Sequence, residues 1–214
     1  MRKQPLVTGS IYHVFNKSIS GYRIFRTKKD YNRMLEMIKF YKYESPPVRF
    51  SAYINRKNKD SFFERYFTDR EHLIEVIAYC LMPTHLHLVL KQLSDKGISV
   101  FMKNLLDSYT RYFNTKNNRK GPLWQGRFKS VLIEDDEQLL HLTRYIHLNP
   151  TSDDLVEKPE DWKYSSYNKY LCKSEEGICN YSEYIEMEAG EYKRFVESRQ
   201  DYQKSLNILK NLKS

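Results

Sequence analysis

The sequence contains few of the residues that mark specialised protein classes: 3 cysteines, 7 glycines and 7 prolines among 214 residues. Three cysteines without a CxxC pair argue against a disulfide framework or a zinc ribbon, and indicate a reducing, cytoplasmic environment. The low glycine and proline content excludes collagen-like and low-complexity chains. No stretch approaches the roughly 18 to 20 apolar residues of a membrane span, and no apolar segment follows the basic N-terminus. We therefore expect an untargeted protein with no membrane contact.

Positive charge is the main feature of the composition. Lys and Arg number 36 against 27 Asp and Glu, which gives a formal charge of +9, and aromatic residues make up 14% of the chain. The basic excess lies in the first 172 residues, because the remainder is slightly acidic. A folded chain of this length and charge indicates a polyanionic partner, although charge alone does not choose between nucleic acid and a membrane surface.

Hydrophobic periodicity predicts an α+β fold. A β-rich run at 11–15 predicts the first strand, and a helix follows that begins at Asp30 and is stopped by Pro46-Pro47. The apolar run 76–90, interrupted at Met82-Pro83-Thr84, predicts a central hairpin of two buried strands. Two further helices, with a short apolar run at 131–133 between them, are expected at 97–114 and at 136–149, where Asn149-Pro150 ends the second.

The same patterns divide the chain into a domain and two additions. Residues 1–172 are expected to form the main domain, within which 48–72 is an irregular, partly helical insertion. Residues 173–214 are expected to form a helical C-terminal extension.

His85 and His87 flank one leucine inside an apolar strand, so both imidazoles project from the same face. Two imidazoles on one strand have the geometry to hold a divalent ion while leaving positions open for substrate oxygens. The other interpretation is one buried, hydrogen-bonded histidine beside a second that lines a polar groove. The three-residue pattern by itself leaves both open.

Tyr145 and Asn149 lie four residues apart on the last predicted helix, and therefore on one face, which His141 shares. A phenol can attack phosphorus to give a phosphotyrosine, and an amide oxygen one turn away could bind the same ion. A helical tyrosine is more often a packing residue, and Asn149 before Pro150 can be a helix terminator. The spacing alone does not decide.

Basic and aromatic side chains alternate between residues 101 and 130, where seven Lys and Arg stand against one Asp. Cations that neutralise phosphates beside rings that stack on unpaired bases favour single-stranded or hairpin nucleic acid over a solvated basic face. The candidate DNA-binding residues are Arg111, Arg119, Lys120, Trp124, Arg127 and Lys129.

Four blocks in this order resemble one protein family: residues 78–88 (AYCLMPTHLHL), 121–129 (GPLWQGRFK), 144–150 (RYIHLNP) and 162–167 (WKYSSY). They resemble the REP-associated tyrosine transposases, which belong to the single-tyrosine HUH transposases. The resemblance extends from about residue 9 to residue 172. It implies a ferredoxin-like α+β fold with the histidine pair on a central strand of an antiparallel sheet and the tyrosine on a following helix.

The resemblance also implies roles for individual residues. His85 and His87 would bind Mg²⁺ or Mn²⁺, Asn149 would join that metal site, and Tyr145 would be the nucleophile that cleaves single-stranded DNA. His141 and His147 receive no metal role. The implied activity is cleavage and rejoining of single-stranded or hairpin DNA through a 5′-phosphotyrosine, without a nucleotide cofactor; the oligomeric state stays open.

Two other functions compete with this interpretation. One is a DNA-binding regulator that keeps the fold and the basic surface but does not cleave. The other is a metal-dependent hydrolase of small phosphoesters, in which Tyr145 only positions substrate. A non-catalytic binder would be free to lose the histidine pair, Tyr145 and Asn149, yet all are present, and a small-molecule hydrolase would not need the basic, aromatic segment.

Overall fold

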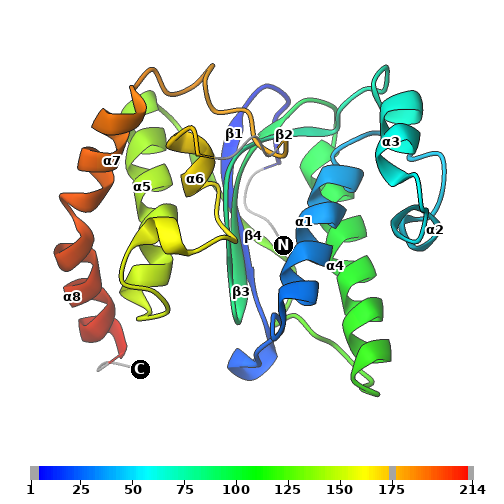
Figure 1. Cartoon of the computed structure of the whole chain (residues 1–214), viewed down its shortest axis with the longest axis horizontal. Coiled ribbons are helices and arrows are strands. Elements are labelled where there is room, and N and C mark those ends of the chain that lie inside the picture. The colour runs from blue at the N-terminus through cyan, green and yellow to red at the C-terminus, as the bar shows by residue number, and fades with distance from the viewer. Residues whose placement is uncertain (1–4, 174–176, 212–214) are drawn as a thin grey trace.

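The structure is a computed structural model that describes residues 5–173 and 177–211, and it confirms the α+β class. Four antiparallel strands form one sheet in the order β2-β3-β1-β4, with helices on both faces (Figure 1). The strands are β1 (Ile11–Lys17), β2 (Ile74–Met82), β3 (His85–Gln92) and β4 (Lys129–Ile133). With one helix after β1 and another after β3, this order is the ferredoxin-like β-α-β-β-α-β arrangement.

One face of the sheet is covered by α1 (Lys28–Tyr41) and α4 (Gly97–Lys116). Leu86, Leu88 and Leu90 of β3 point to this side and are buried in the larger apolar cluster. Successive strand side chains alternate between faces, so the residues between these leucines point to the opposite side.

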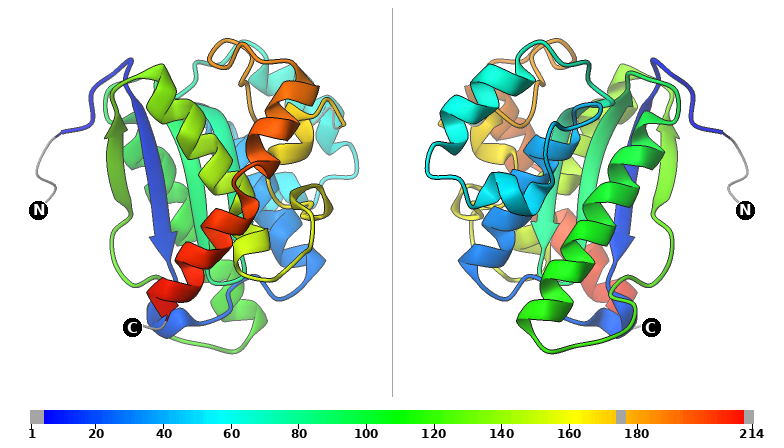
Figure 2. Two further views of the ribbon diagram at one scale, coloured as in Figure 1. Left: turned by 90° about the vertical axis from the view of Figure 1, so that its left-hand side faces the viewer. Right: turned by 90° about the vertical axis from the view of Figure 1, so that its right-hand side faces the viewer.

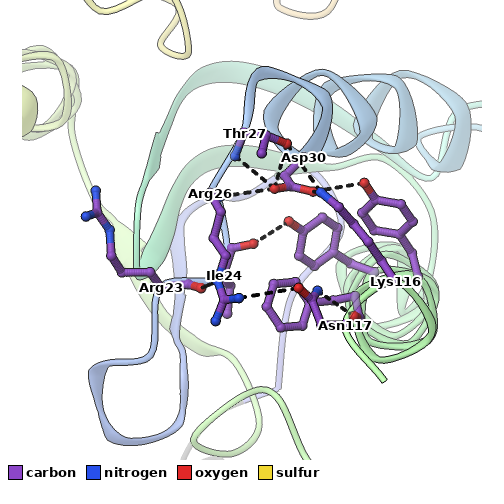
Figure 3. A network of polar contacts seen from close by, with 10 residues as sticks. Arg23, Ile24, Arg26, Thr27, Asp30, Lys116 and Asn117 are labelled. Carbon is purple, nitrogen blue, oxygen red and sulfur yellow. Dashed lines mark hydrogen bonds and ion pairs between the residues drawn. The ribbon is translucent and has the colours of Figure 1, made fainter. Parts of the chain in front are cut away.

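The start of α1 is fixed to α4 by a buried carboxylate (Figure 3). Thr27 is the N-cap and Asp30 completes the capping box, so the helix begins two residues before the predicted Asp30. Asp30 Oδ1 accepts hydrogen bonds from Lys116 Nζ at 2.6 Å and Tyr112 Oη at 2.8 Å. Burial would raise the pKa of Asp30, but the hydrogen bonds from Lys116, Tyr112 and Thr27 outweigh it and hold that pKa below its ordinary value.

The other face is covered by α5 (Asp136–Ser152), with further helices packed outside it. The views in Figure 2 place these helices over the β2–β3 half of the sheet, while the β1–β4 half of this face stays open. On β4, Val131 is accordingly exposed. The outer helices are η2 (Pro159–Asp161), α6 (Tyr167–Tyr170), α7 (Ala189–Glu197) and α8 (Gln200–Asn211).

The predicted end of this helix at Asn149-Pro150 is wrong, because α5 continues through Pro150 to Ser152. A proline near the C-terminal end of a helix removes only one backbone hydrogen bond. The carbonyls of the last turn of a helix lack intrahelical donors in any case and accept from other groups. The amide of Asp153 donates to the carbonyl of Asn149, and the hydroxyls of Thr151 and Ser152 donate to that of Leu148. These bonds preserve the last turn.

The segment 48–72 is more regular than the sequence indicates. It contains α2 (Phe50–Ile54) and α3 (Lys59–Phe67). Outside this segment, a short 3₁₀ turn, η1 (Ile19–Gly21), follows β1. Rings of Phe40 from α1, Tyr53 from α2 and Phe67 from α3 pack together with centroids 5.0 to 6.3 Å apart. This aromatic contact fixes the insertion against α1.

In the C-terminal segment, the predicted helices are present at α7 and α8, while residues 174–176 and 212–214 lie outside the described residues. Tyr192 and Val196 of α7 are buried in the same apolar cluster as Leu139 and Ile146 of α5. None of the helices in the described part of the chain combines the length and apolarity needed to cross a membrane. The division at residue 172 stays a prediction.

Candidate active site

His85 and His87 project from β3 toward the α5 side of the sheet. Their rings lie 5.0 Å apart at an interplanar angle of 84°, and His87 is only 6% exposed. Burial lowers the pKa of both, with a smaller contribution from the Lys17 charge, and brings that of His85 to about 4. Both imidazoles are therefore neutral at pH 7, with a lone pair available for a ligand.

Each of these histidines uses its Nδ1 atom toward a neighbouring side chain. His85 Nδ1 lies 3.0 Å from the hydroxyl oxygen of Thr84, and His87 Nδ1 lies 2.9 Å from Nε2 of His13. The two Nε2 atoms are not used by these contacts. A histidine that binds a metal ordinarily donates its other ring N–H to such a partner.

His13 is a residue of this site that sequence reasoning missed. It stands on β1, and its ring stacks on that of His87 with centroids 5.1 Å apart. The alternation of His13 and Phe15 with buried neighbours could have indicated a strand face. Only the pairing of β1 with β3 places that face beside the histidine pair, since Phe15 is opposite His87 in the register.

The structure brings Tyr145 of α5 beside the histidine pair. The Tyr145 ring lies 6.0 Å from that of His87, edge to face, and Tyr145 is 37% exposed. Asn149, one turn further along α5, is 8% exposed, and its Nδ2 atom has no hydrogen-bond partner among the described residues. Burial, and then the charge of Asp153, raise the pKa of Tyr145, so its phenol is protonated at neutral pH.

Helix α5 carries two histidines, His141 and His147, whose surroundings differ from those of the pair on β3. His147 is fully buried, and its two ring nitrogens lie 2.8 Å from Tyr192 Oη and 2.8 Å from Ser166 Oγ. Ser166 in turn accepts from the backbone amide of Tyr79 in β2 at 2.9 Å. His141 lies near the surface, 2.6 Å from Arg144. The RYIHLNP and WKYSSY blocks thus meet in a buried network that fixes the tyrosine helix to the sheet.

The C-terminal helix α8 also contacts α5. Gln203 donates from Nε2 to the backbone carbonyl of Tyr145 at 3.0 Å, and Lys204 forms an ion pair with Asp154 just beyond the end of α5. The helix that carries Tyr145 is therefore held from both sides, by the sheet and by the C-terminal segment.

Within the part of the chain that the structure describes, no three His, Cys, Asp or Glu side chains are placed to share one metal ion. A metal at this site would depend on imidazoles together with the amide of Asn149. The three cysteines, Cys80, Cys172 and Cys179, are free thiols.

The basic segment lines a groove at the edge of the sheet, which we call the β4 groove. It has a volume of about 1050 Å³ and lies between α4, β4 and the loop before β4. Lys103, Trp124, Arg127, Phe128 and Lys129 are among its lining residues, and so is Phe15, which is next to the histidine pair. Trp124 is only 9% exposed, and its Nε1 donates to the carbonyl of Leu106 at 3.3 Å.

The remaining candidate DNA-binding residues lie elsewhere. The Arg119 guanidinium donates to Asn114 Oδ1 at 3.0 Å and to the carbonyl of Pro122 at 2.6 Å, so it shapes its own loop. Lys120 is exposed on that loop. Arg111 lines a different groove, on the other flank of α4. The structure thus separates residues that are close in sequence, and their contacts with DNA stay a prediction.

Comparison with known proteins identifies the family of this chain. A family model described as "Transposase IS200 like" matches residues 48–149. A putative REP-associated tyrosine transposase of Haemophilus influenzae is 31% identical over 121 residues, which cover 51% of this chain and 69% of that protein. A REP-associated tyrosine transposase of Escherichia coli K12 is 24% identical over 106 residues, which cover 49% of this chain and 61% of the relative.

The chain belongs to the REP-associated tyrosine transposases. Its family makes it a DNA transposase and hence a DNA-processing enzyme. A solved structure of a REP-associated tyrosine transposase bound to a REP hairpin matches with a TM-score of 0.56 at 16% identity, over 88% of this chain and 95% of that one. This match confirms the expected fold.

Proposed function

We propose that this transposase cleaves and rejoins single-stranded or hairpin DNA through a 5′-phosphotyrosine formed at Tyr145. The observation that carries the proposal is the position of Tyr145, whose half-exposed ring stands 6.0 Å from the His87 ring within a single chain. A nucleophile and neutral imidazole nitrogens, placed beside the open half of a sheet face, are what phosphoryl transfer to a side chain needs.

The residues at this site fit a divalent ion, Mg²⁺ or Mn²⁺. His85 and His87 supply uncharged imidazoles, and Asn149, whose buried Nδ2 atom has no hydrogen-bond partner among the described residues, would supply an oxygen once its amide is turned about its last torsion. A bound divalent ion would supply positive charge that polarises a phosphate oxygen and favours ionisation of a nearby phenol.

Tyr145 performs the covalent step in this proposal. Its Oη atom forms a bond to phosphorus and loses its proton, while the bond from phosphorus to the 3′ oxygen breaks and that oxygen takes up a proton. The phosphotyrosine ester conserves the energy of the broken phosphodiester, so that attack by another 3′-hydroxyl rejoins DNA without a nucleotide cofactor.

His13 acts in this proposal as a positioning residue. If His87 donates its Nδ1–H to His13 Nε2, then His87 presents the lone pair of Nε2 to the ion. His13→Ala should weaken Mn²⁺ binding by about 10- to 100-fold. His13→Gln, whose amide oxygen can accept the same hydrogen bond, should restore part of the affinity, as measured by calorimetry. Equal affinities in the wild type and His13→Ala would refute this role.

The DNA would reach Tyr145 along the β4 groove. Arg127 and Lys129 line that groove beside Phe15, whose ring centroid lies 5.9 Å from that of His87. The cations would neutralise backbone phosphates near the site where cleavage occurs. The H. influenzae and E. coli relatives are named as transposases, and the matching solved structure carries a REP hairpin, which supports hairpin DNA as the partner of this chain.

One incubation tests the proposal against its alternatives. Labelled hairpin DNA with a single-stranded flank is mixed with the protein and Mn²⁺, and a covalent protein–DNA band is sought on a denaturing gel. We expect the band with the wild type and with Tyr66→Phe, a control at an exposed tyrosine on α3. Tyr145→Phe should abolish it while leaving hairpin binding nearly unchanged, because only the attacking oxygen is lost.

The outcomes separate the competing functions. Hairpin binding without any adduct, with or without Mn²⁺, would favour the non-catalytic regulator. Turnover of a small phosphodiester without an adduct would favour the hydrolase. An adduct that persists in Tyr145→Phe would move the nucleophile to another tyrosine.

The cytoplasmic location expected from the cysteines stays a prediction.

A further inference from the structure

A second groove lies on the side of the sheet that faces away from the histidine pair; we call it the α2 groove. It has a volume of about 1040 Å³ and lies between α1, α4 and the 48–72 insertion, whose helix α2 contacts α1 through the rings of Phe50 and Phe40. Its cationic lining residues are Lys29 and Arg33 of α1, Arg49 next to α2, and Arg111 and Lys116 of α4.

The charges of this groove are not balanced. Among the described residues, those that line it include no Asp or Glu. Lys116 is paired with Asp30, which is already engaged by Tyr112 and the α1 cap (Figure 3). The other four cations form no ion pair within the described part of the chain. In the β4 groove, by contrast, Lys103 has Asp107 at 3.6 Å. Four uncompensated cations around one hollow repel one another and favour an anionic ligand.

Arg33 is the most constrained of these cations. Its guanidinium carbon lies 4.3 Å from the Tyr112 ring centroid and 5.2 Å from that of Phe50, so the side chain is held between two rings. Its Nε atom is buried without a hydrogen-bond partner among the described residues. Burial lowers the pKa of Arg33, and no carboxylate counters this. A guanidinium held between two rings is suited to a phosphate oxygen, whereas a merely solvated arginine would keep its rotamer freedom.

Helix α4 separates the two grooves and lines both of them. Asn104, Ser108, Arg111 and Thr115, which are spaced three or four residues apart, face the α2 groove, and Ser99, Lys103 and Leu106 face the β4 groove. These two stripes are roughly 140° apart around the helix, at about 100° of rotation per residue. A polyanion leaving the β4 groove therefore needs to cross only one helix to enter the α2 groove.

We propose that the α2 groove binds backbone phosphates of the DNA substrate at a segment remote from the one held at Tyr145. The proposal rests on the proposed function, since it extends the same DNA across α4. The insertion 48–72 would then lengthen the DNA-binding surface, through Arg49 and the ring of Phe50. A free phosphate-bearing small molecule offers the same chemistry, and the test distinguishes the two sources.

The test compares long and short DNA in EDTA, where binding is measured by fluorescence anisotropy as a function of salt. The long ligand is a hairpin with single-stranded flanks; the short one is a single strand of about eight nucleotides, on the order of one binding site. The variant is Lys29→Gln/Arg49→Gln, at two exposed positions. The matched control is Lys158→Gln/Lys163→Gln, which removes two exposed cations that line neither groove.

For the long ligand, Lys29→Gln/Arg49→Gln should lower the magnitude of the slope of log affinity against log salt by about 1.4 to 1.8, the value for two lost phosphate contacts. The control should leave that slope unchanged, and the short ligand should bind wild type and variant alike. Adduct formation on the short strand with Mn²⁺ should also be unchanged.

Three results would overturn the proposal. An unchanged slope for the long hairpin would remove the α2 groove from the DNA path. An equal change in the control would reduce it to an effect of net charge. An unchanged slope together with inorganic phosphate raising the melting temperature of the wild type but not of the variant would assign a small phosphate ligand instead. If the wild type itself neither binds the hairpin nor forms an adduct, the proposed function fails rather than this inference.

Discussion

The two faces of strand β3 differ in the kind of side chain that each presents. Leu86, Leu88 and Leu90 point toward α1 and α4 and are completely buried. His85 and His87 point toward α5, where the helix covers only part of the sheet and Tyr145 remains half-exposed. One strand therefore contributes apolar burial on one side and uncharged, reactive nitrogen on the other.

This difference separates stability from chemistry along a single strand. The face under α1 and α4 is closed and apolar, so a change there acts through the packing of the core. On the α5 face, buried polar side chains are tolerated because they have partners, such as Thr84 for His85 and His13 for His87. Substitutions at neighbouring positions of β3 should consequently affect different properties: one lowers the stability of the fold, and the other lowers the affinity for metal.

The largest effect is expected for His87→Ala. Cleavage should be lost and Mn²⁺ affinity should fall by at least about 100-fold, because one of two imidazole ligands is missing. Calorimetry with Mn²⁺ measures this, with Val89→Ala as the control on the same face of the strand. Unchanged Mn²⁺ affinity in His87→Ala would reassign the histidine pair to packing or to direct phosphate contact.

Leu88→Ala tests the opposite face. Removing a fully buried leucine side chain should lower the free energy of unfolding by about 2 to 5 kcal/mol, as measured by urea denaturation. Mn²⁺ affinity of the folded variant should stay within a few fold of the wild type. If Leu88→Ala lost metal binding while still folded, the two faces of β3 would not be independent.

A smaller effect is expected when the pH is lowered: the free energy of unfolding should decrease because of a buried histidine of α5. Burial lowers the pKa of His147 to about 3, against an ordinary value of 6.5, so between these values the unfolded chain binds a proton that the folded chain does not. Stability should therefore be full above pH 6.5 and fall as the pH decreases, by about 1.4 kcal/mol per pH unit for each such histidine.

Two variants attribute this pH dependence to the buried histidine. Urea denaturation in EDTA at pH 7.5, 6 and 5 should give a shallower pH dependence for His147→Gln than for the wild type, whereas His141→Gln, at a position near the surface, should keep the full dependence. His13 and His85, whose pKa values burial brings to about 4, contribute in the same direction. Identical profiles for His147→Gln and the wild type would contradict the prediction.

The smallest effect is expected for two cations that line the β4 groove, and it concerns the salt dependence of DNA binding. Arg127→Gln/Lys129→Gln should lower the magnitude of the salt slope for single-stranded DNA by about 1.4, with little change in melting temperature. Trp124→Ala should instead lower the melting temperature, because Trp124 is largely buried and its Nε1 donates to the carbonyl of Leu106. A loss of affinity of about 1 to 3 kcal/mol at an unchanged slope and melting temperature would show instead that its ring stacks on a base.

Local sequence patterns were sufficient for most of the elements. The apolar run interrupted at Met82-Pro83-Thr84 fits two buried strands joined by a tight turn better than one helix, and β2 and β3 confirm this hairpin. The prediction failed where it treated Pro150 as an obligatory stop. The last turn of α5 is preserved by hydroxyls and backbone groups around Thr151 and Ser152, which no rule about proline alone anticipates.

The candidate site was only partly accessible from the sequence. His85 and His87 share a face because strand side chains alternate, and Tyr145 and Asn149 share one because a helix turns every 3.6 residues. The meeting of these two pairs was implied by resemblance to a family, not by spacing. His13 was missed because nothing local indicates that its strand lies beside β3.

What the sequence by itself determined is therefore the local geometry: the strand with two histidines on one face, the helix with tyrosine and asparagine one turn apart, and the concentration of cations between residues 101 and 130. The tertiary structure alone decided which residues far apart in the sequence contact one another. It set His13 against His87, placed the Tyr145 ring 6.0 Å from His87, and divided the basic segment between two flanks of α4. Backbone periodicity is a property of neighbouring residues, whereas strand order and helix packing depend on burying apolar surface from the whole chain at once.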